Sequence, residues 1–313
     1  MAGALSPLLG IALKLLSALA FTLMSAGIKS IAERYPTGEL VFTRSFFALI
    51  PLLIWMAWRS DLPHALRTHN LGGHFKRGVI GSTGMFLGFA ALQYLPLSSA
   101  VALGYAAPLA VVALAAVILK ERVRIYRWSA VTIGFGGVLI MLSPHLANLS
   151  DGRTLQAGAA LGAALALGGA FCSAFATIEV RLLTKTEGTG AIVFYFMAMT
   201  SLLGLATIVL GWRMPDARDA LMMVTIGVLG GVAQILLVQS YRHGDASLIA
   251  PFEYSTMIWA LVIGWFWFGE WPAGTILIGA AIVTASGIYV ILRERQLGLL
   301  HREQREAGPS RPA

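Results

Sequence analysis

Ten apolar stretches follow one another along the chain, and they constrain its fold more than any other feature. Most of them are long enough to cross the hydrocarbon core of a bilayer as a helix, which takes about 20 residues. Most of the gaps between them are short and carry turn or charged residues. The sequence therefore predicts an all-α polytopic membrane protein with ten transmembrane helices, at residues 7–31, 38–58, 77–95, 98–119, 128–143, 155–183, 191–211, 221–241, 246–268 and 274–292.

Composition excludes the main soluble alternatives. Hydrophobic residues make up 57% of the chain and charged residues 12%, and a soluble surface cannot hide so much apolar side chain. Apolar and polar residues do not alternate as they do in the strands of an outer-membrane barrel, so helices are favoured. The net charge of +8 comes from loops and the tail, which leaves no basic stripe for nucleic acid. Cys172, the single cysteine, excludes a disulfide framework.

The placement of Lys and Arg predicts that both termini are cytoplasmic. In that orientation sixteen of the 23 basic residues lie in inner loops and the tail, and five lie outside. Lys14 and Arg44 fall within apolar stretches and complete the count. The charged segment 293–313, which also carries Gly and Pro, is expected to be a disordered cytoplasmic tail.

A weak internal repeat divides the ten stretches into two sets of five. Shifting the chain by 149 residues gives seven identities over 44 positions. Each half, 7–143 and 155–292, holds an odd number of spans, so equivalent helices must cross in opposite directions. Inverted repeats of this kind are typical of secondary transporters that bind substrate near the bilayer midplane. The identical pairs are Gly78 and Gly227, Val79 and Val228, Gly81 and Gly230, Leu87 and Leu236, Ser98 and Ser247, Tyr105 and Tyr254, and Glu121 and Glu270.

Two segments, one in each half, resemble a known family. They are 91–100 leading to Lys120-Glu121-Arg122, and 250–254 leading to Gly269-Glu270. With them, the whole of 7–292 is similar to EamA-type members of the drug/metabolite transporter superfamily. The resemblance implies two inverted five-helix repeats around a central cavity in the bacterial inner membrane, a small-molecule substrate, surrounding lipid and no cofactor.

A narrower resemblance concerns the substrate. The segments 251–254 and 42–44, together with Trp259, are similar to bacterial riboflavin importers, and S-adenosylmethionine carriers are almost as similar. We therefore expect riboflavin uptake by alternating access. The alternatives are export of amino acids or related metabolites and transport of S-adenosylmethionine. The sequence leaves proton coupling and dimer formation open.

Ionisable residues within membrane spans usually face a cavity or a partner. Glu253 on the ninth span and Lys14 on the first are predicted to line the inner part of the cavity; a fixed buried ion pair is the alternative. Pro251 interrupts the helix just before Glu253 and frees a backbone carbonyl. Arg44 either attracts an anionic or carbonyl-rich substrate or anchors loop carbonyls.

Aromatic and amide side chains complete the candidate site. Tyr105 and Tyr254 each lie seven residues into their spans, from opposite faces, as a pair of gates or as part of an interfacial aromatic belt. Trp259 lies mid-span, where its indole N–H needs an acceptor, and could stack on a flat ring. Gln93 and Gln234 either bind substrate or a neighbouring helix.

Other classes of protein fit less well. No Gly-x-x-x-x-Gly-Lys-Ser/Thr loop for a primary pump is present. An intramembrane lipid-modifying enzyme is a remote alternative, since no histidine lies deep in a span to act as a base. His64, His69 and His74 are too widely spaced to predict a metal site. Glu121 and Glu270 end their helices and are expected to find a basic partner or backbone N–H groups there.

Overall fold

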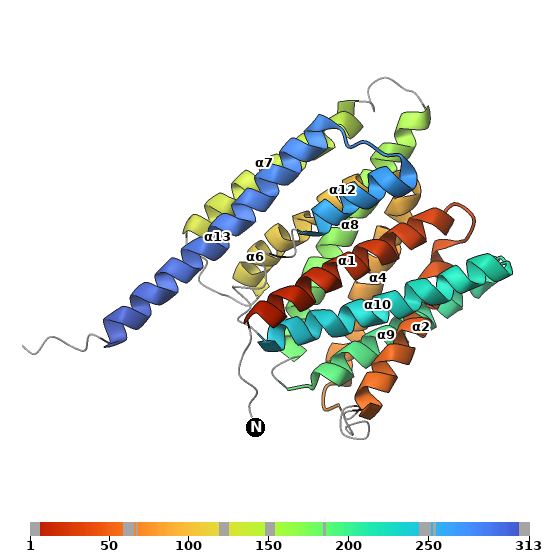
Figure 1. The fold of residues 1–313 in the computed structure, drawn as a ribbon, viewed down its shortest axis with the longest axis horizontal. Helices are drawn as coiled ribbons and strands as arrows, with labels where there is room; N and C mark the ends of the chain where they lie inside the picture. Colours follow the sequence, from red (N-terminus) through yellow and green to blue (C-terminus); the bar gives the residue numbers. More distant parts are fainter. Residues whose placement is uncertain are drawn as a thin grey trace, which may run out of the picture.

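The computed structural model describes residues 7–58, 66, 68–118, 125–147, 154–183, 186–243, 252 and 255–306, and within them it contains helices and no strand (Figure 1). The first half holds α1 (Pro7–Ile31), α2 (Thr37–Trp58), α4 (Leu71–Tyr94), α5 (Leu97–Gly104), α6 (Ala106–Ile118) and α7 (Ile125–Ala147). The second half holds α8 (Thr154–Leu183), α9 (Thr189–Ala206), the 3-10 helix η1 (Thr207–Leu210), α10 (Ala217–His243), α12 (Ser255–Phe268) and α13 (Gly274–Glu306).

Each predicted apolar stretch contains helix, which confirms the all-α fold. Within the part of the chain that the structure describes, five helical segments are by themselves long and apolar enough to cross a membrane, namely those of α1, α2, α8, α10 and α9 with η1. Large apolar side chains such as Phe135, Phe171 and Phe266 are exposed on the surface. Such a surface suits lipid and not water.

The two halves exchange helices. α1 and α2 both pack against α10 from the second half, whereas α8 and α9 both pack against α4 from the first half. We call α1, α2 and α10 the first bundle, and α8, α9 and α4 the second bundle. α2 and α9 lie against each other where the bundles meet. Exchanging the two halves maps one bundle onto the other, as the inverted repeat requires.

α7 and α13 form a separate pair that runs side by side along one edge (Figure 1). Two glycines allow this close approach. A Cβ atom added to Gly137 would lie 2.8 Å from the carbonyl oxygen of Gly279, and one added to Gly279 would lie 2.5 Å from that of Gly137. Small residues let helices in membranes pack backbone to backbone in this way.

The largest differences from the predicted helix boundaries occur at three places. α4 begins at Leu71 and not near Arg77, because the Asn70 side chain accepts a hydrogen bond from the Gly73 N–H and caps the helix. The stretch 98–119 is broken at Tyr105 into α5 and α6. α13 continues past Leu292 to Glu306, so the expected disorder does not apply to 293–306, where Arg, Glu, Gln and Leu favour helix. Residues 307–313 lie outside the described part.

Candidate substrate-binding site

One end of the two bundles is closed by contacts that cross between them. We call it the outer end, because the Lys and Arg distribution predicts that it faces away from the cytoplasm. Lys29 of α1 donates from Nζ to the carbonyl oxygen of Leu95 at 2.8 Å, just beyond the end of α4. Gln93 of α4 donates from Nε2 to Oγ1 of Thr37 at 3.1 Å. Both hydrogen bonds join the first bundle to the second.

Glu270, which follows α12, completes what we call the outer closure. Its Oε1 lies 3.1 Å from Nζ of Lys29, and its Oε2 accepts a hydrogen bond from the Leu97 N–H at 3.0 Å. Glu270 was expected to find a basic partner or backbone N–H groups, and it finds one of each. Glu121, its equivalent in the first half, lies outside the described residues.

A second set of contacts at the outer end holds the first bundle together. Asp219, in the first turn of α10, is buried and lies 2.8 Å from Nη1 of Arg34. The hydroxyl of Tyr35 donates to the same carboxylate oxygen at 2.9 Å. We call these three residues the outer latch. It ties the loop after α1 to the start of α10.

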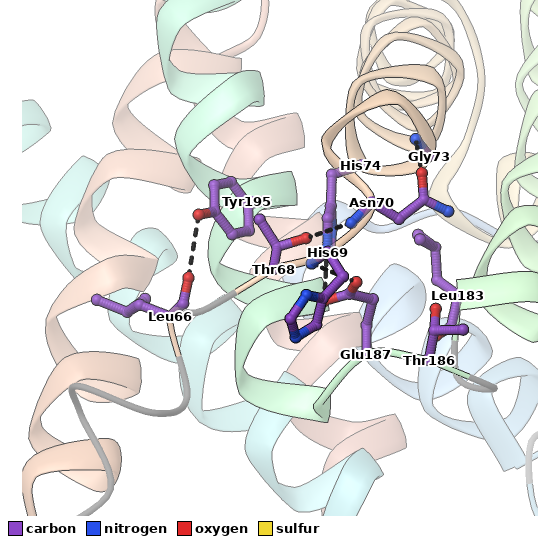
Figure 2. Close-up of polar contacts among 10 residues, drawn as sticks. All are labelled: Leu66, Thr68, His69, Asn70, Gly73, His74, Leu183, Thr186, Glu187 and Tyr195. Carbon is purple, nitrogen blue, oxygen red and sulfur yellow. Dashed lines mark hydrogen bonds and ion pairs between the residues drawn. The ribbon is translucent and has the colours of Figure 1, made fainter.

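The opposite end carries a matching inner latch, formed by His69, His74 and Glu187 (Figure 2). Glu187, in the loop after α8, accepts a hydrogen bond from the His69 N–H at 2.9 Å, and its Oε2 lies 3.5 Å from Nε2 of His74. The hydroxyl of Tyr195 donates to the Leu66 carbonyl at 3.0 Å while its ring lies against His74. His69 contacts Glu187 through its backbone N–H, and the described residues contain no group of three His, Cys, Asp or Glu side chains that could hold a metal ion.

The two latches show that equivalent helices run in opposite directions. The outer latch places the start of α10 at the end of the molecule where α1 finishes. The inner latch places the start of α4 where α8 finishes, at the opposite end. α4 and α10 are the third helices of the two halves, so the halves are inverted relative to each other.

Tyr105 lies at the break between α5 and α6, where it contacts a residue of the second half of the chain. Pro108 lacks the backbone N–H that would bond the Gly104 carbonyl, and α5 ends at that residue. Tyr105 is buried, and its hydroxyl shares a hydrogen bond of 2.5 Å with Oγ1 of Thr256 at the start of α12. Interrupted helices with freed carbonyls are a common feature of transporter substrate sites.

Trp259, three residues along α12 from Thr256, packs against the large apolar cluster that includes Met24, Phe89 and Ile263. Its Nε1 is buried and has no hydrogen-bond acceptor among the described residues. A buried N–H without an acceptor costs about 1–3 kcal/mol, so this atom is available to an incoming oxygen.

Arg44 does not contact loop carbonyls in the described structure, although one of the two sequence interpretations expected that. It is 4% exposed, and its Nη1 donates to the sulfur of Met197 at 3.2 Å. Its Nε has no acceptor among the described residues. Sequence reasoning also missed Arg77 as a site residue, because it placed Arg77 at the edge of the third apolar stretch and counted it with the cytoplasmic basic residues. The Asn70 cap is the signal that could have placed Arg77 inside α4.

The remaining predicted residues are only partly described. Lys14 is buried on α1 at 2% exposure and has an interaction partner. Gln234 is half-buried on α10. Gln93 binds a neighbouring helix, the second of its two predicted roles. Glu253 and Tyr254 lie outside the described residues, so their roles stay predictions.

Comparison with known proteins identifies relatives over nearly the whole chain. The riboflavin transporter of Vibrio cholerae is 27% identical over 91% of this chain and 93% of its own length. The S-adenosylmethionine uptake transporter of Rickettsia prowazekii is 25% identical over 92% and 94%. The pseudopaline exporter CntI of Pseudomonas aeruginosa is 26% identical over 89% and 94%.

Structural and family comparisons agree with this placement. A solved crystal structure matches 92% of this chain and 98% of its own, with a TM-score of 0.64 and 18% identity, which shows a shared fold. The EamA-like transporter family model matches residues 8–143 and again 160–293, one match in each half. The chain belongs to the EamA-like transporter family.

Proposed function

We propose that this protein is a secondary transporter or facilitator of the bacterial inner membrane that takes up riboflavin by alternating access. Both termini are cytoplasmic in this proposal, and the repeats 7–143 and 155–292 rock about a site near the midplane. The outer closure is then the state in which the cavity opens inward. Tyr105 and Tyr254 line the cavity, and Glu253 and Lys14 line its inner part.

The observation that carries the substrate proposal is the buried indole N–H of Trp259. The flavin ring is flat and bears carbonyl oxygens, so one aromatic side chain can both stack on it and donate to it. Riboflavin transporters among the relatives, from Vibrio cholerae and from Rhizobium johnstonii, support the same substrate. The exporter and S-adenosylmethionine carrier among them supply the competing substrates for the test.

Counterflow in proteoliposomes tests this proposal. Vesicles preloaded with unlabelled riboflavin at matched pH are expected to accumulate labelled riboflavin transiently. Trp259→Phe keeps the ring and removes the N–H, and it should raise the half-saturating concentration about threefold to tenfold, the value of one hydrogen bond. Trp265→Phe, on the exposed side of α12, is the matched control and should behave as wild type.

The same vesicles separate the alternatives. Accumulation that is equal in wild type and Trp259→Phe would keep riboflavin as substrate and remove Trp259 from the site. Accumulation of S-adenosylmethionine or of an amino acid, without accumulation of riboflavin, would contradict the substrate proposal and leave the transport function standing. Absence of counterflow for every solute would contradict transport itself.

A further inference from the structure

Two arginines lie close together inside the helix assembly, on either side of one turn of α9. Arg44 of α2 contacts Met197, and the guanidinium of Arg77 on α4 lies 3.9 Å above the ring of Phe196. Met197 and Phe196 are adjacent in the sequence, so the two positive charges lie against neighbouring residues of α9. Arg44 Nε and the Nε and Nη1 of Arg77 are buried without an acceptor among the described residues.

Nearby carboxylates do not neutralise this charge, because the buried acidic residues that the structure describes contact other groups. Glu39 accepts from the Arg213 N–H, Asp219 contacts Arg34 and Tyr35, Glu179 contacts Lys76, and Glu187 contacts His69 and His74. A thioether sulfur and an aromatic face are weak substitutes for a carboxylate. Unpaired charge buried at membrane depth usually marks a functional site.

Each guanidinium group lies beside a glycine, whose missing side chain leaves space for it. The two glycines occupy equivalent positions in the two halves. A Cβ atom on Gly81 would collide with Nη1 of Arg77 and lie 2.8 Å from Phe196. A Cβ atom on Gly230 would lie 2.8 Å from Met24 and 3.2 Å from Nε of Arg44. Gly81 and Gly230 are paired by the 149-residue shift, so both halves make space for an arginine at the same repeat position.

We propose that Arg44 and Arg77 together bind an oxyanion of the transported substrate, a carboxylate or a phosphate. This inference rests on the proposed transport function, and it replaces neutral riboflavin by an acidic metabolite as the preferred substrate. Guanidinium groups bind such oxygens through paired, charge-assisted hydrogen bonds. The three buried N–H groups then gain acceptors, and the bound negative charge removes the repulsion between the arginines. Ser201, one turn of α9 beyond Met197, has a buried hydroxyl without a partner among the described residues and can add a further donor.

For a flavin, the proposal favours riboflavin 5′-phosphate over riboflavin itself. The neutral vitamin carries no oxyanion, whereas its phosphate ester presents one at the end of a flexible chain. Met24, whose sulfur lies beside the same Gly230 as Arg44, belongs to the apolar cluster against which Trp259 packs. Arg44 and Trp259 therefore both border this apolar cluster.

Binding to the full chain in lipid nanodiscs tests the oxyanion site. Riboflavin and riboflavin 5′-phosphate share one fluorophore, so quenching of flavin fluorescence measures both dissociation constants. Wild type is expected to bind the phosphate ester at least about tenfold more tightly, since charge-assisted hydrogen bonds contribute more than neutral ones. Arg44→Gln and Arg77→Gln should remove that preference. Arg218→Gln, at an exposed arginine, should retain it.

Thermal unfolding with other probes identifies the source of the oxyanion and controls for misfolding. Citrate, glutamate, inorganic phosphate and riboflavin 5′-phosphate are compared with choline and riboflavin. At least one oxyanion is expected to raise the Tm of wild type and of Arg218→Gln, and to leave the two glutamine variants unchanged. Without ligand, those variants should keep the wild-type Tm or exceed it, because each loses a repelling buried charge. Arg77→Lys should recover part of the oxyanion response.

Each result bears on one proposal. If no oxyanion stabilises wild type, or if the response persists in Arg44→Gln and Arg77→Gln, the oxyanion site is wrong. A large fall in the ligand-free Tm of both glutamine variants would also overturn it, by assigning the arginines to the fold. Riboflavin counterflow unaffected by either variant would leave the transport proposal intact. Oxyanion binding without flavin counterflow would remove the substrate proposal and keep the site.

Discussion

Lys29 and Glu270 belong to different halves of the chain and meet at the outer end, with Nζ 3.1 Å from Oε1. Each also binds the segment between α4 and α5: Lys29 the Leu95 carbonyl and Glu270 the Leu97 N–H. Both side chains are mostly buried, so this pair is less screened by solvent than a surface ion pair. The outer closure therefore depends on two side chains that satisfy a backbone donor and a backbone acceptor at once.

Glu270→Gln should weaken the outer closure. The amide keeps an acceptor for the Leu97 N–H and loses the ion pair, which shifts the equilibrium toward outer opening by about 1 kcal/mol, or roughly fivefold. A cysteine at Ser98 in a Cys172→Ser background reports this as faster labelling by a membrane-impermeant maleimide. The charge exchange Lys29→Glu with Glu270→Lys should not restore slow labelling, because the exchanged side chains no longer match the Leu95 carbonyl and the Leu97 N–H. Equal labelling in all three proteins would show that the pair does not close this end.

Glu187 predicts an acid-sensitive inner latch. Burial opposes its ionisation, but the hydrogen bond from the His69 N–H and the neighbouring Thr68 and His74 side chains outweigh it and lower its pKa below the usual value. A carboxyl with a lowered folded-state pKa stabilises the protein above its unfolded pKa of about 4.3, and this contribution is lost as pH falls through the lower folded value. The Tm of wild type should thus fall more steeply than that of Glu187→Gln below about pH 4.5. Parallel profiles would contradict the latch.

Asp219→Asn should destabilise the first bundle. The buried carboxylate holds both Arg34 and Tyr35, and the amide keeps the hydrogen bond from Tyr35 at best while losing the ion pair. The expected loss is about 1–3 kcal/mol of unfolding free energy. Thermal unfolding in detergent measures it, with Glu33→Gln as the control because Glu33 is exposed in the neighbouring loop. A control that loses as much would show a general effect of charge and not of this contact.

Neighbouring glycines of α7 are expected to differ sharply. Gly137→Ala places a methyl group 2.8 Å from the Gly279 carbonyl, which overpacks the contact between α7 and α13 and should cost about 1–3 kcal/mol. Gly136→Ala meets nothing within 4 Å and should be neutral or stabilise the helix by up to about 1 kcal/mol. The Tm values of the two variants in the same detergent test this difference. Similar shifts would contradict the close packing of α7 against α13.

Most of the fold could be predicted from the apolar stretches, because a segment of about 20 apolar residues has few alternatives to a transmembrane helix. Tyr105 shows where that information ends. The residue stands inside an unbroken apolar run, and only Pro108, a full turn later, signals the break between α5 and α6. The partner of Tyr105, Thr256, lies 151 positions away and follows from tertiary packing alone.

The candidate site was less predictable than the fold for a physical reason. Arg77 follows the segment Gly72-Gly73-His74-Phe75-Lys76 and therefore looks like the edge of a span. The cap at Asn70 starts the helix six residues earlier and places Arg77 inside it. The type of partner that Glu270 finds could be predicted, since a carboxylate at the C-terminal end of a helix needs a donor. Its particular partners, Lys29 and the Leu97 N–H, depend on how the two halves meet.

The exchange of helices between the bundles also sets the order in which the protein can be completed during synthesis. α1 and α2 enter the membrane first, yet their shared partner α10 belongs to the last third of the chain. Until the ribosome reaches that point, Ser17 lacks the Ala233 carbonyl that its buried hydroxyl finally binds at 2.8 Å. Before α10 is synthesised, the face of α1 that carries Ser17 therefore lacks its final partner. A chain that ends after α7 would leave this face without α10.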